Sequence, residues 1–315
     1  MPSPNRIVAF LHPNLGDAVH HSITTRWIHE AWPSARLVVV TGKLGEAILG
    51  GCPWIDDVWC SSGNKYGLFP RILREKFDLA LFPYVQNSFL RMAIAARIPA
   101  RVGIRGGKYD RFLTRSTHVE PTENVIGDAV EALLGLLGKP AGSGDAYIAC
   151  SAAADREADR LFGRRNGQTV ALMVGAGNMH KLWPRDRFVG LAERFLDEGY
   201  GVVSVGGSSE KGSFEGLPGV LDLAGRCSVL GTAEILRRCA LVVANDTGVA
   251  HLAAAVNTPT VVIYGPSRVL LPPGGPSVIL RRTCDCAAYE LGQCDGACLR
   301  GHSVDEVFRA ATALL

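Results

Sequence analysis

Short apolar runs alternate with amphipathic segments along the first half of the chain. Residues 6–11 (RIVAFL), 35–42 (ARLVVVTG) and 77–83 (FDLALFP) predict buried strands. Residues 18–32 and 87–98 are predicted to form helices that follow two of these strands. Alternating strands and helices of this kind are typical of a parallel α/β sheet.

The same alternation restarts after a segment at 138–147 that is rich in Gly, Pro and Ser. Further strands are predicted at 169–177, 200–207, 241–248 and 258–265. We therefore predict two Rossmann-like, doubly wound α/β domains, 1–150 and 151–315, that face a cleft. The last helix, 303–315, is a candidate to pack back on the first domain. In such sheets, ligands bind beyond the carboxyl ends of the strands.

The composition narrows the class of protein. The chain has 315 residues, of which 47% are hydrophobic and 20% charged, and its net charge is +3. That charge is too small to indicate a nucleic-acid partner. No apolar run approaches the roughly 20 residues of a transmembrane helix, and the N-terminal run is too short for a secretory signal. We expect a cytoplasmic protein, with peripheral contact with a membrane left open.

The turn after the 241–248 strand concentrates polar chemistry. Asp246, Thr247 and Gly248 are the last residues of the 241–248 segment, and they precede a small-residue helix that contains His251. Backbone N–H groups at the start of a helix favour an anion, and Gly248 would let a ligand approach the backbone closely. Asp246 is equally well explained as a helix N-cap, and His251 alone as a core histidine.

Two more turns follow predicted strands in the second half. Residues 174–184 (VGAGNMHKLWP) contain Gly177 and Lys181, whose charge would offset phosphate; Lys181 taken alone is also typical of a solvated lysine. The spacing is not that of a Walker A loop. Residues 205–212 (VGGSSEKG) contain Glu210, and a carboxylate there suits ribose hydroxyls.

Taken together, these motifs resemble the family-nine glycosyltransferases, the bacterial heptosyltransferase group. The resemblance rests on NDTGVAHLAAAVNTPTVVIYGPS at 245–267, KLWPRDRFVGLAERF at 181–195 and LGD at 15–17, in the family's order. It implies the two-domain GT-B fold. It also implies an inverting transfer from a nucleotide-diphosphate sugar, often ADP-heptose, to a sugar acceptor.

The resemblance also implies roles for individual residues. Asp17 matches the general base, Lys181 a diphosphate-contacting lysine and Glu210 a residue at the ribose, while Cys227 falls near an adenine-lining position. The predicted donor site is completed by Gly177, Asp246, Thr247, Gly248 and His251. Asp17 is open to a second interpretation as a helix N-cap. The sequence contains no Asp-x-Asp pair, so we predict transfer without a catalytic metal or other cofactor.

A basic segment at 101–115 lies in the predicted acceptor domain. Arg101, Arg105 and Lys108 are the candidate acceptor-binding residues, and they suit a phosphorylated or carboxylated acceptor. A solvated loop explains them equally well. The acceptor class stays open between the lipopolysaccharide core or another glycolipid, a protein and a small natural product.

Four of the nine cysteines crowd together near the C-terminus. Cys284, Cys286, Cys294 and Cys298 have the pattern Cys-x-Cys-x7-Cys-x3-Cys. Four thiolates suit a structural Zn or Fe, and some heptosyltransferases that modify proteins resemble this in holding iron on cysteines. Packing cysteines or disulfides formed after purification are the alternatives.

Two other functions remain as hypotheses. The first is an NAD(P)-type dinucleotide-binding oxidoreductase, although the first strand-to-helix turn (HPNLGDAVHH) lacks Gly-x-Gly-x-x-Gly. The second is a catalytically silent protein that binds a sugar nucleotide.

Overall fold

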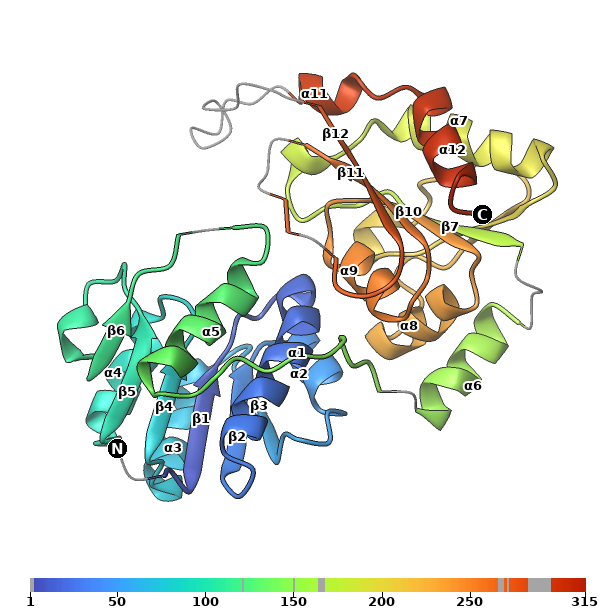
Figure 1. Cartoon of the computed structure of the whole chain (residues 1–315). Coiled ribbons are helices and arrows are strands. Elements are labelled where there is room, and N and C mark those ends of the chain that lie inside the picture. Colours follow the sequence, from blue (N-terminus) through green and yellow to red (C-terminus); the bar gives the residue numbers. More distant parts are fainter. Residues whose placement is uncertain are drawn as a thin grey trace. The chain divides into compact units, whose positions relative to one another are not determined.

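The computed structural model describes residues 3–120, 122–149, 151–163, 168–265, 269–270, 272–282 and 296–315. The chain divides into two compact units, Met1–Ala149 and Cys150–Leu315 (Figure 1). Each unit is built on its own six-stranded sheet, and all the paired strands are parallel.

The first unit has the strand order β3-β2-β1-β4-β5-β6. Its strands are β1 (Arg6–Phe10), β2 (Arg36–Thr41), β3 (Asp57–Cys60), β4 (Leu79–Phe82), β5 (Ala100–Ile104) and β6 (Arg115–Thr117). Its helices are α1 (Leu15–Ala31), α2 (Lys43–Leu49), α3 (Phe69–Glu75), α4 (Asn87–Ala95) and α5 (Val125–Leu136), with short 3-10 turns η1 (Lys65–Leu68) and η2 (Asp110–Phe112). Helix α1 packs with α2 and α5, whereas α3 packs with α4 on the other face (Figure 1).

The second unit repeats this winding with the order β12-β11-β10-β7-β8-β9. Its strands are β7 (Thr169–Met173), β8 (Gly201–Ser204), β9 (Val220–Asp222), β10 (Leu241–Asn245), β11 (Thr260–Tyr264) and β12 (Ser277–Arg281). Its helices are α6 (Ala152–Leu161), α7 (Arg185–Asp197), α8 (Val229–Arg237), α9 (Gly248–Ala255), α11 (Ala297–Arg300) and α12 (Val304–Thr312), with 3-10 turns η3 (Met179–Lys181) and η4 (Ser208–Glu210). The last helix, α12, packs on α7 and β11.

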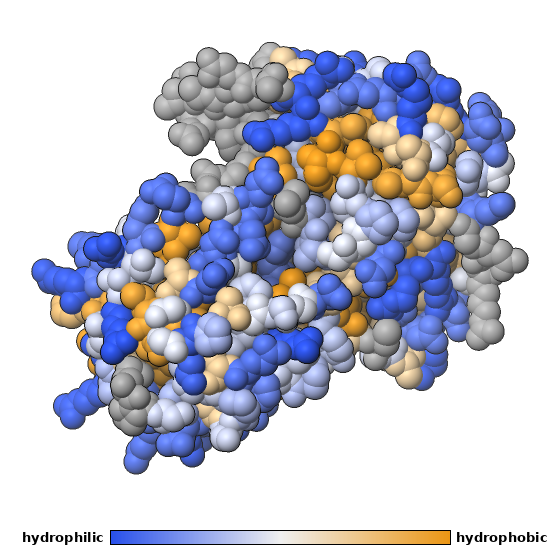
Figure 2. Space-filling model, in the orientation of Figure 1, coloured by the Kyte–Doolittle hydropathy of each residue, from blue (hydrophilic) through white to orange (hydrophobic). Residues whose placement is uncertain are grey.

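Burial explains why these segments form parallel strands. Every residue of β7, β10 and β11 is buried, as expected for a sheet that helices cover on both faces. The edge strand β12 is only half-buried, and Figure 2 shows hydrophobic residues gathered over β11 and β12 on the face in view. In the first unit, the rings of Phe82 and Phe89 stack on Phe10 at centroid distances of 5.0 and 4.8 Å. The prediction of an α/β fold with two doubly wound sheets is confirmed.

The strand order creates one topological switch point in each sheet. The winding direction reverses between β1 and β4 in the first unit and between β7 and β10 in the second. Ligands of doubly wound sheets bind at such points, outside the carboxyl ends of the strands. Among the described residues, no helix is both long enough and apolar enough to span a bilayer.

Candidate functional site

Asp17 lies at the switch point of the first unit, in the first turn of α1. The N-cap of that helix is Asn14, so Asp17 is free of the capping role. Its carboxylate instead lies against the loop that leaves β1, with Oδ2 2.8 Å from Nδ1 of His12. The Asp17 side chain keeps 24% of its surface exposed, which leaves room for a hydroxyl group to reach it.

The surroundings of Asp17 keep its carboxylate ionised. Burial alone would raise its pKa, but hydrogen bonding and charge from His12, the charge of His21 and a hydrogen bond from Asn14 together lower the pKa below the ordinary value of 3.8. Burial lowers the pKa of His21 to about 4, although the Asp17 charge opposes this shift. At neutral pH, His21 is therefore a neutral buried ring beside an anionic Asp17.

Lys181 and Asp246 meet at the switch point of the second unit. Lys181 ends η3, after β7, and its Nζ lies 2.6 Å from Oδ2 of Asp246, which follows β10. The side chains keep 25% and 9% of their surface exposed, respectively. The N-cap of α9 is Thr247, without a capping hydrogen bond from its side chain. Asp246 therefore aligns Lys181 at the start of α9 and does not cap that helix.

Thr247 and Gly248 complete this helix start. The hydroxyl of Thr247 is buried and has no hydrogen-bond partner among the residues described. The first N–H groups of α9 have no intrahelical acceptors, because the first turn of any helix leaves its donors unused. A lysine, a hydroxyl and helix N–H groups thus converge at one place, which is the donor set that suits a phosphate.

Asn245, which the sequence analysis did not single out, joins the two turns of this site. Its Nδ2 donates to the carbonyl oxygen of Val174 at 2.7 Å, and its Oδ1 accepts from the backbone N–H of Trp183 at 2.9 Å. Asn245 is fully buried. Lys181 therefore lies on a segment that is tied to the end of β10 immediately before Asp246.

We predict that Asn245→Ala destabilises the second unit. The substitution leaves two buried backbone groups without partners, which costs about 2–4 kcal/mol and should lower Tm by roughly 5–10 °C in scanning calorimetry. Asn178→Ala is the matched control, because Asn178 is exposed and its side chain accepts only from the nearby N–H of His180. An equal loss for both variants would contradict the role given to Asn245.

Glu210 and the glycine-rich turn after β7 also lie close together. A Cβ added to Gly175 would stand 2.4 Å from Cδ of Glu210, so a side chain at 175 would displace this carboxylate. Gly177 has open space around it. Oε1 of Glu210 accepts from the hydroxyl of Ser209 at 2.5 Å. The order β10-β7-β8 places Glu210 one strand further along the edge from the Lys181 turn.

Cys227 and His251 differ in their exposure. Cys227 is half-buried in the loop after β9. A hydrogen bond joins this loop to the loop after β8: the N–H of Gly225 donates to the carbonyl oxygen of Gly206 at 2.9 Å. Burial raises the pKa of the Cys227 thiol to about 11, with a smaller contribution from Glu157. Cys227 is therefore a neutral thiol at neutral pH. His251 is 3% exposed inside α9.

The three candidate acceptor-binding residues lie at different ends of β5. Arg105 and Lys108 are exposed beyond its carboxyl end. The carboxylate of Asp110, in the same loop, accepts from the backbone N–H groups of Gly106 and Gly107 at 2.6 and 3.0 Å. Because Asp110 is used in this way, Arg105 and Lys108 stay available to bind an anionic group. Arg101 lies near the amino end, and its guanidinium donates to the carbonyl oxygens of Ile98 and Phe112.

The predicted cysteine cluster lies mostly outside the described residues. Cys284, Cys286 and Cys294 fall in the undescribed segment 283–295, whereas Cys298 is buried in α11 within the core of the second unit. Among the residues that the structure describes, no group of three or more His, Cys, Asp or Glu side chains is placed to hold a metal.

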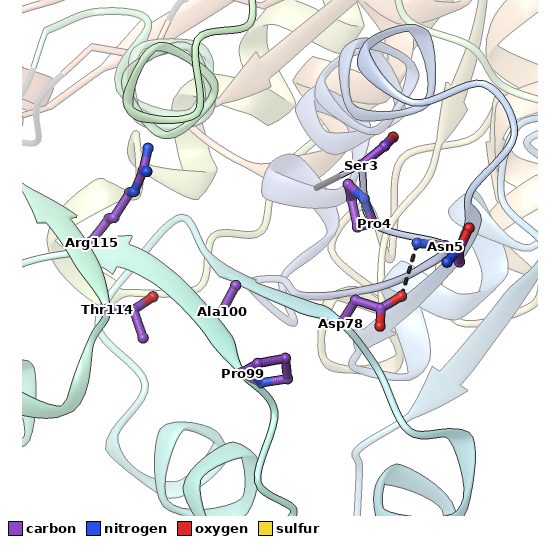
Figure 3. A pocket seen from close by; sticks show the side chains of 8 residues that line it. All are labelled: Ser3, Pro4, Asn5, Asp78, Pro99, Ala100, Thr114 and Arg115. Carbon is purple, nitrogen blue, oxygen red and sulfur yellow. Dashed lines mark hydrogen bonds between the residues drawn. The ribbon is translucent and has the colours of Figure 1, made fainter. Parts of the chain in front are cut away.

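A pocket of about 350 Å³ opens at the amino ends of the strands of the first sheet (Figure 3). Its lining residues precede or begin strands at their amino ends: Ser3, Pro4, Asn5, Asp78, Pro99, Ala100, Thr114 and Arg115. The carboxylate of Asp78 already accepts from the N–H groups of Asn5 and Arg6 at 2.8 and 3.0 Å. Because doubly wound sheets bind ligands at the carboxyl ends, we place one candidate site in each unit, at Asp17 in the first and at Lys181 in the second.

Comparisons with known proteins identify the family and the fold of the chain. The model of glycosyltransferase family 9 (heptosyltransferase) matches residues 67–283. Lipooligosaccharide heptosyltransferase 2 of Haemophilus influenzae is 34% identical over 96 residues, and the alignment spans 28% of the length of each chain.

Two solved structures extend the comparison to nearly the whole chain. A family 9 glycosyltransferase from Veillonella parvula aligns with a TM-score of 0.85 at 21% identity, covering 98% of this chain and 97% of the other. The ADP-heptose LPS heptosyltransferase II of Escherichia coli aligns with a TM-score of 0.78 at 20% identity, covering 98% of both chains. These likenesses show that the fold is shared.

Proposed function

This chain belongs to glycosyltransferase family 9, the heptosyltransferase family, and on that premise we propose that it moves a heptose from ADP-heptose to a hydroxyl of a sugar-containing acceptor with inversion. The observation that carries the proposal is the pairing of Lys181 with Asp246 at the start of α9. It places the ammonium group of Lys181 beside the N–H donors of the helix start, at the switch point where this fold class binds ligands.

The reaction we propose needs one base and one site for the leaving group. Asp17 takes the proton of the acceptor hydroxyl as the acceptor oxygen forms a bond to the anomeric carbon of the heptose. The bond from that carbon to the diphosphate oxygen breaks, and its electron pair leaves with ADP. Lys181, Thr247 and the first N–H groups of α9 stabilise the developing charge on the diphosphate.

Most other residues of the predicted donor site lie in successive turns at the carboxyl ends of the strands, and we assign them to parts of ADP-heptose. We propose that Glu210 accepts from the ribose hydroxyls, with Gly177 leaving space between it and the diphosphate, and that Cys227 lines the adenine. Gly248 allows close approach of the donor to the backbone, and His251 supports α9 from its buried side. ADP-heptose is the donor named for the E. coli enzyme of the same fold, and it is the first donor to test.

The acceptor side of the proposal rests on exposed cations. Arg105 and Lys108 extend from the carboxyl end of β5, so they suit an acceptor that carries phosphate or carboxylate groups. We propose the lipooligosaccharide core as the first acceptor, following the name of the Haemophilus relative. Arg101 stays a predicted acceptor residue, with its guanidinium bonded to backbone carbonyl groups.

A ligand-binding screen separates the proposal from its alternatives. ADP-heptose at 100 times its dissociation constant should stabilise the protein by about 2.7 kcal/mol in a thermal-shift assay. An oxidoreductase would instead be stabilised by NAD or NADP. A sugar-nucleotide-binding protein without activity would be stabilised by ADP-heptose but would release no ADP with any acceptor.

We predict that transfer needs no divalent cation. Hard cations require several oxygen ligands, whereas the turns of the site offer Asp246 already paired with Lys181, and Glu210 one strand away. Full initial rates should persist in excess EDTA. The assay is kept short and folding is followed by circular dichroism, because EDTA would also remove the predicted structural Zn or Fe from the cysteine cluster and so destabilise the protein. An immediate stop that Mg²⁺ reverses, with the fold unchanged, would contradict this mechanism.

A further inference from the structure

We propose that His12 is a positioning residue for Asp17: its Nδ1–H holds Oδ2 of the carboxylate and leaves Oδ1 turned toward the acceptor hydroxyl. The inference rests on the proposed function, in which Asp17 is the general base. It adds a residue that neither the motifs nor the comparisons single out.

The contact itself is the first observation. Nδ1 of His12 lies 2.8 Å from Oδ2 of Asp17. That nitrogen is shielded from solvent, and no acceptor among the described residues meets full hydrogen-bond geometry with it, so its contact with Asp17 rests on the short distance between the two atoms. A ring nitrogen that is buried against an anion is most stable when it carries a proton and donates it. The 2.8 Å distance to the Asp17 carboxylate therefore favours the tautomer with hydrogen on Nδ1.

Residues at the carboxyl ends of β2 and β4 hold the His12 backbone and ring in place. The hydroxyl of Thr41, at the end of β2, donates to the carbonyl oxygen of His12 at 3.0 Å. The ring of Tyr84, after β4, lies 4.8 Å from the His12 ring, and its hydroxyl donates to the carbonyl oxygen of Leu11 at 3.0 Å. A Cβ at Gly42 would stand 2.6 Å from Cβ of Pro13. The His12 loop is therefore closely packed, as a positioning group requires.

The other titratable neighbours of Asp17, His21 and Tyr84, are engaged elsewhere, so we assign the positioning of its carboxylate to His12. His21, on α1, is fully buried and neutral at neutral pH, because burial lowers its pKa to about 4, and its Nδ1 lies 3.0 Å from the hydroxyl of Thr24. Tyr84 stays protonated, because burial and the Asp17 charge raise its pKa. Asn14 supplies a further hydrogen bond. Of these neighbours, His12 has a ring that contacts the carboxylate, and its loop is held by hydrogen bonds from Thr41 and Tyr84.

A series of substitutions tests which ring nitrogen matters. In His12→Asn the amide nitrogen can occupy the place of Nδ1, whereas in His12→Gln it occupies the place of Nε2, and His12→Ala has neither. We expect kcat to fall about 30- to 100-fold in the Ala and Gln variants, as for a catalytic group displaced by about 1 Å. We expect the Asn variant to recover most of the rate, with KM for both substrates nearly constant in all three. His29→Ala, at the far end of α1, is the control with unchanged rates.

A second measurement reads the contact without any transfer reaction. The Asp17 carboxyl is titrated by carbon-13 NMR in the whole protein. His12 and its neighbours hold the wild-type pKa below 3.8, while burial acts to raise it. Without His12, less opposes the effect of burial, which raises the pKa of Asp17. The Asp17 pKa should therefore rise in His12→Ala and stay low in His12→Asn. The acidic limb of the rate profile should shift to higher pH in the Ala variant, because activity needs the ionised carboxylate.

The outcomes separate this inference from the proposed function. Wild-type kcat and an unchanged Asp17 pKa in His12→Ala would overturn the positioning role even if Asp17 is the base. Equal rates for the Asn and Gln variants would overturn the assignment to Nδ1. If Asp17→Asn stays active, the general-base proposal fails, and with it the catalytic part of this inference, while the NMR titration still decides whether His12 holds the Asp17 carboxylate.

Discussion

Asp17→Asn should abolish transfer while leaving the binding of ADP-heptose intact. The variant keeps the shape of the side chain and its place in the first turn of α1, but an amide cannot take the acceptor proton. General-base catalysis contributes about 10²- to 10⁴-fold, so kcat should fall by about that factor. At neutral pH the wild-type carboxylate is ionised, since its pKa lies below 3.8.

The measurement is turnover of ADP-heptose in parallel with calorimetric binding of the donor. Glu30→Gln is the matched control: it neutralises an exposed acid at the other end of α1, where Glu30 pairs with Arg26. That control should keep normal turnover. A near-normal rate for Asp17→Asn would remove Asp17 from the mechanism and leave the fold assignment untouched.

Lys181→Ala should weaken the binding of ADP far more than the binding of adenosine. The substitution removes the cation that faces the diphosphate, and it also removes the ammonium group 2.6 Å from the carboxylate of Asp246, which is 9% exposed. The negative charge of Asp246 is then no longer offset by Lys181 and repels a diphosphate nearby. We expect kcat/KM to fall by about 10²- to 10³-fold, as for the loss of one group that stabilises transition-state charge.

A double variant separates the two effects. Lys181→Ala with Asp246→Asn removes both charges, so ADP binding should recover in part relative to Lys181→Ala alone. Lys211→Ala, an exposed lysine just beyond η4, is the control, with ADP affinity close to that of the wild type. Equal losses for ADP and adenosine in Lys181→Ala would show that Lys181 does not contact phosphate.

The alternation of apolar runs and helical segments was enough to predict the fold class. Strands such as β7 and β10 are buried along their whole length, and burial on both faces produces a continuous apolar run that is visible in a single sequence. The edge strand β12 was not predicted, because it is only half-buried and its signal is correspondingly weak.

The sequence by itself determined which turns carry polar chemistry, since Asp17, Lys181, Glu210 and Asp246 all follow predicted strands. It left open whether Asp17 and Asp246 cap helices, because capping depends on where each helix begins. The structure places the caps at Asn14 and Thr247.

Only the tertiary structure decided which side chains meet. Lys181 and Asp246 are 65 residues apart in sequence, and the parallel pairing of β7 with β10 brings their turns together. Tyr84 reaches the His12 loop in the same way, through the pairing of β1 with β4. Strand order is set by long-range packing of whole elements, and no local pattern records it. That is why Asn245 and His12 became evident only in the folded molecule.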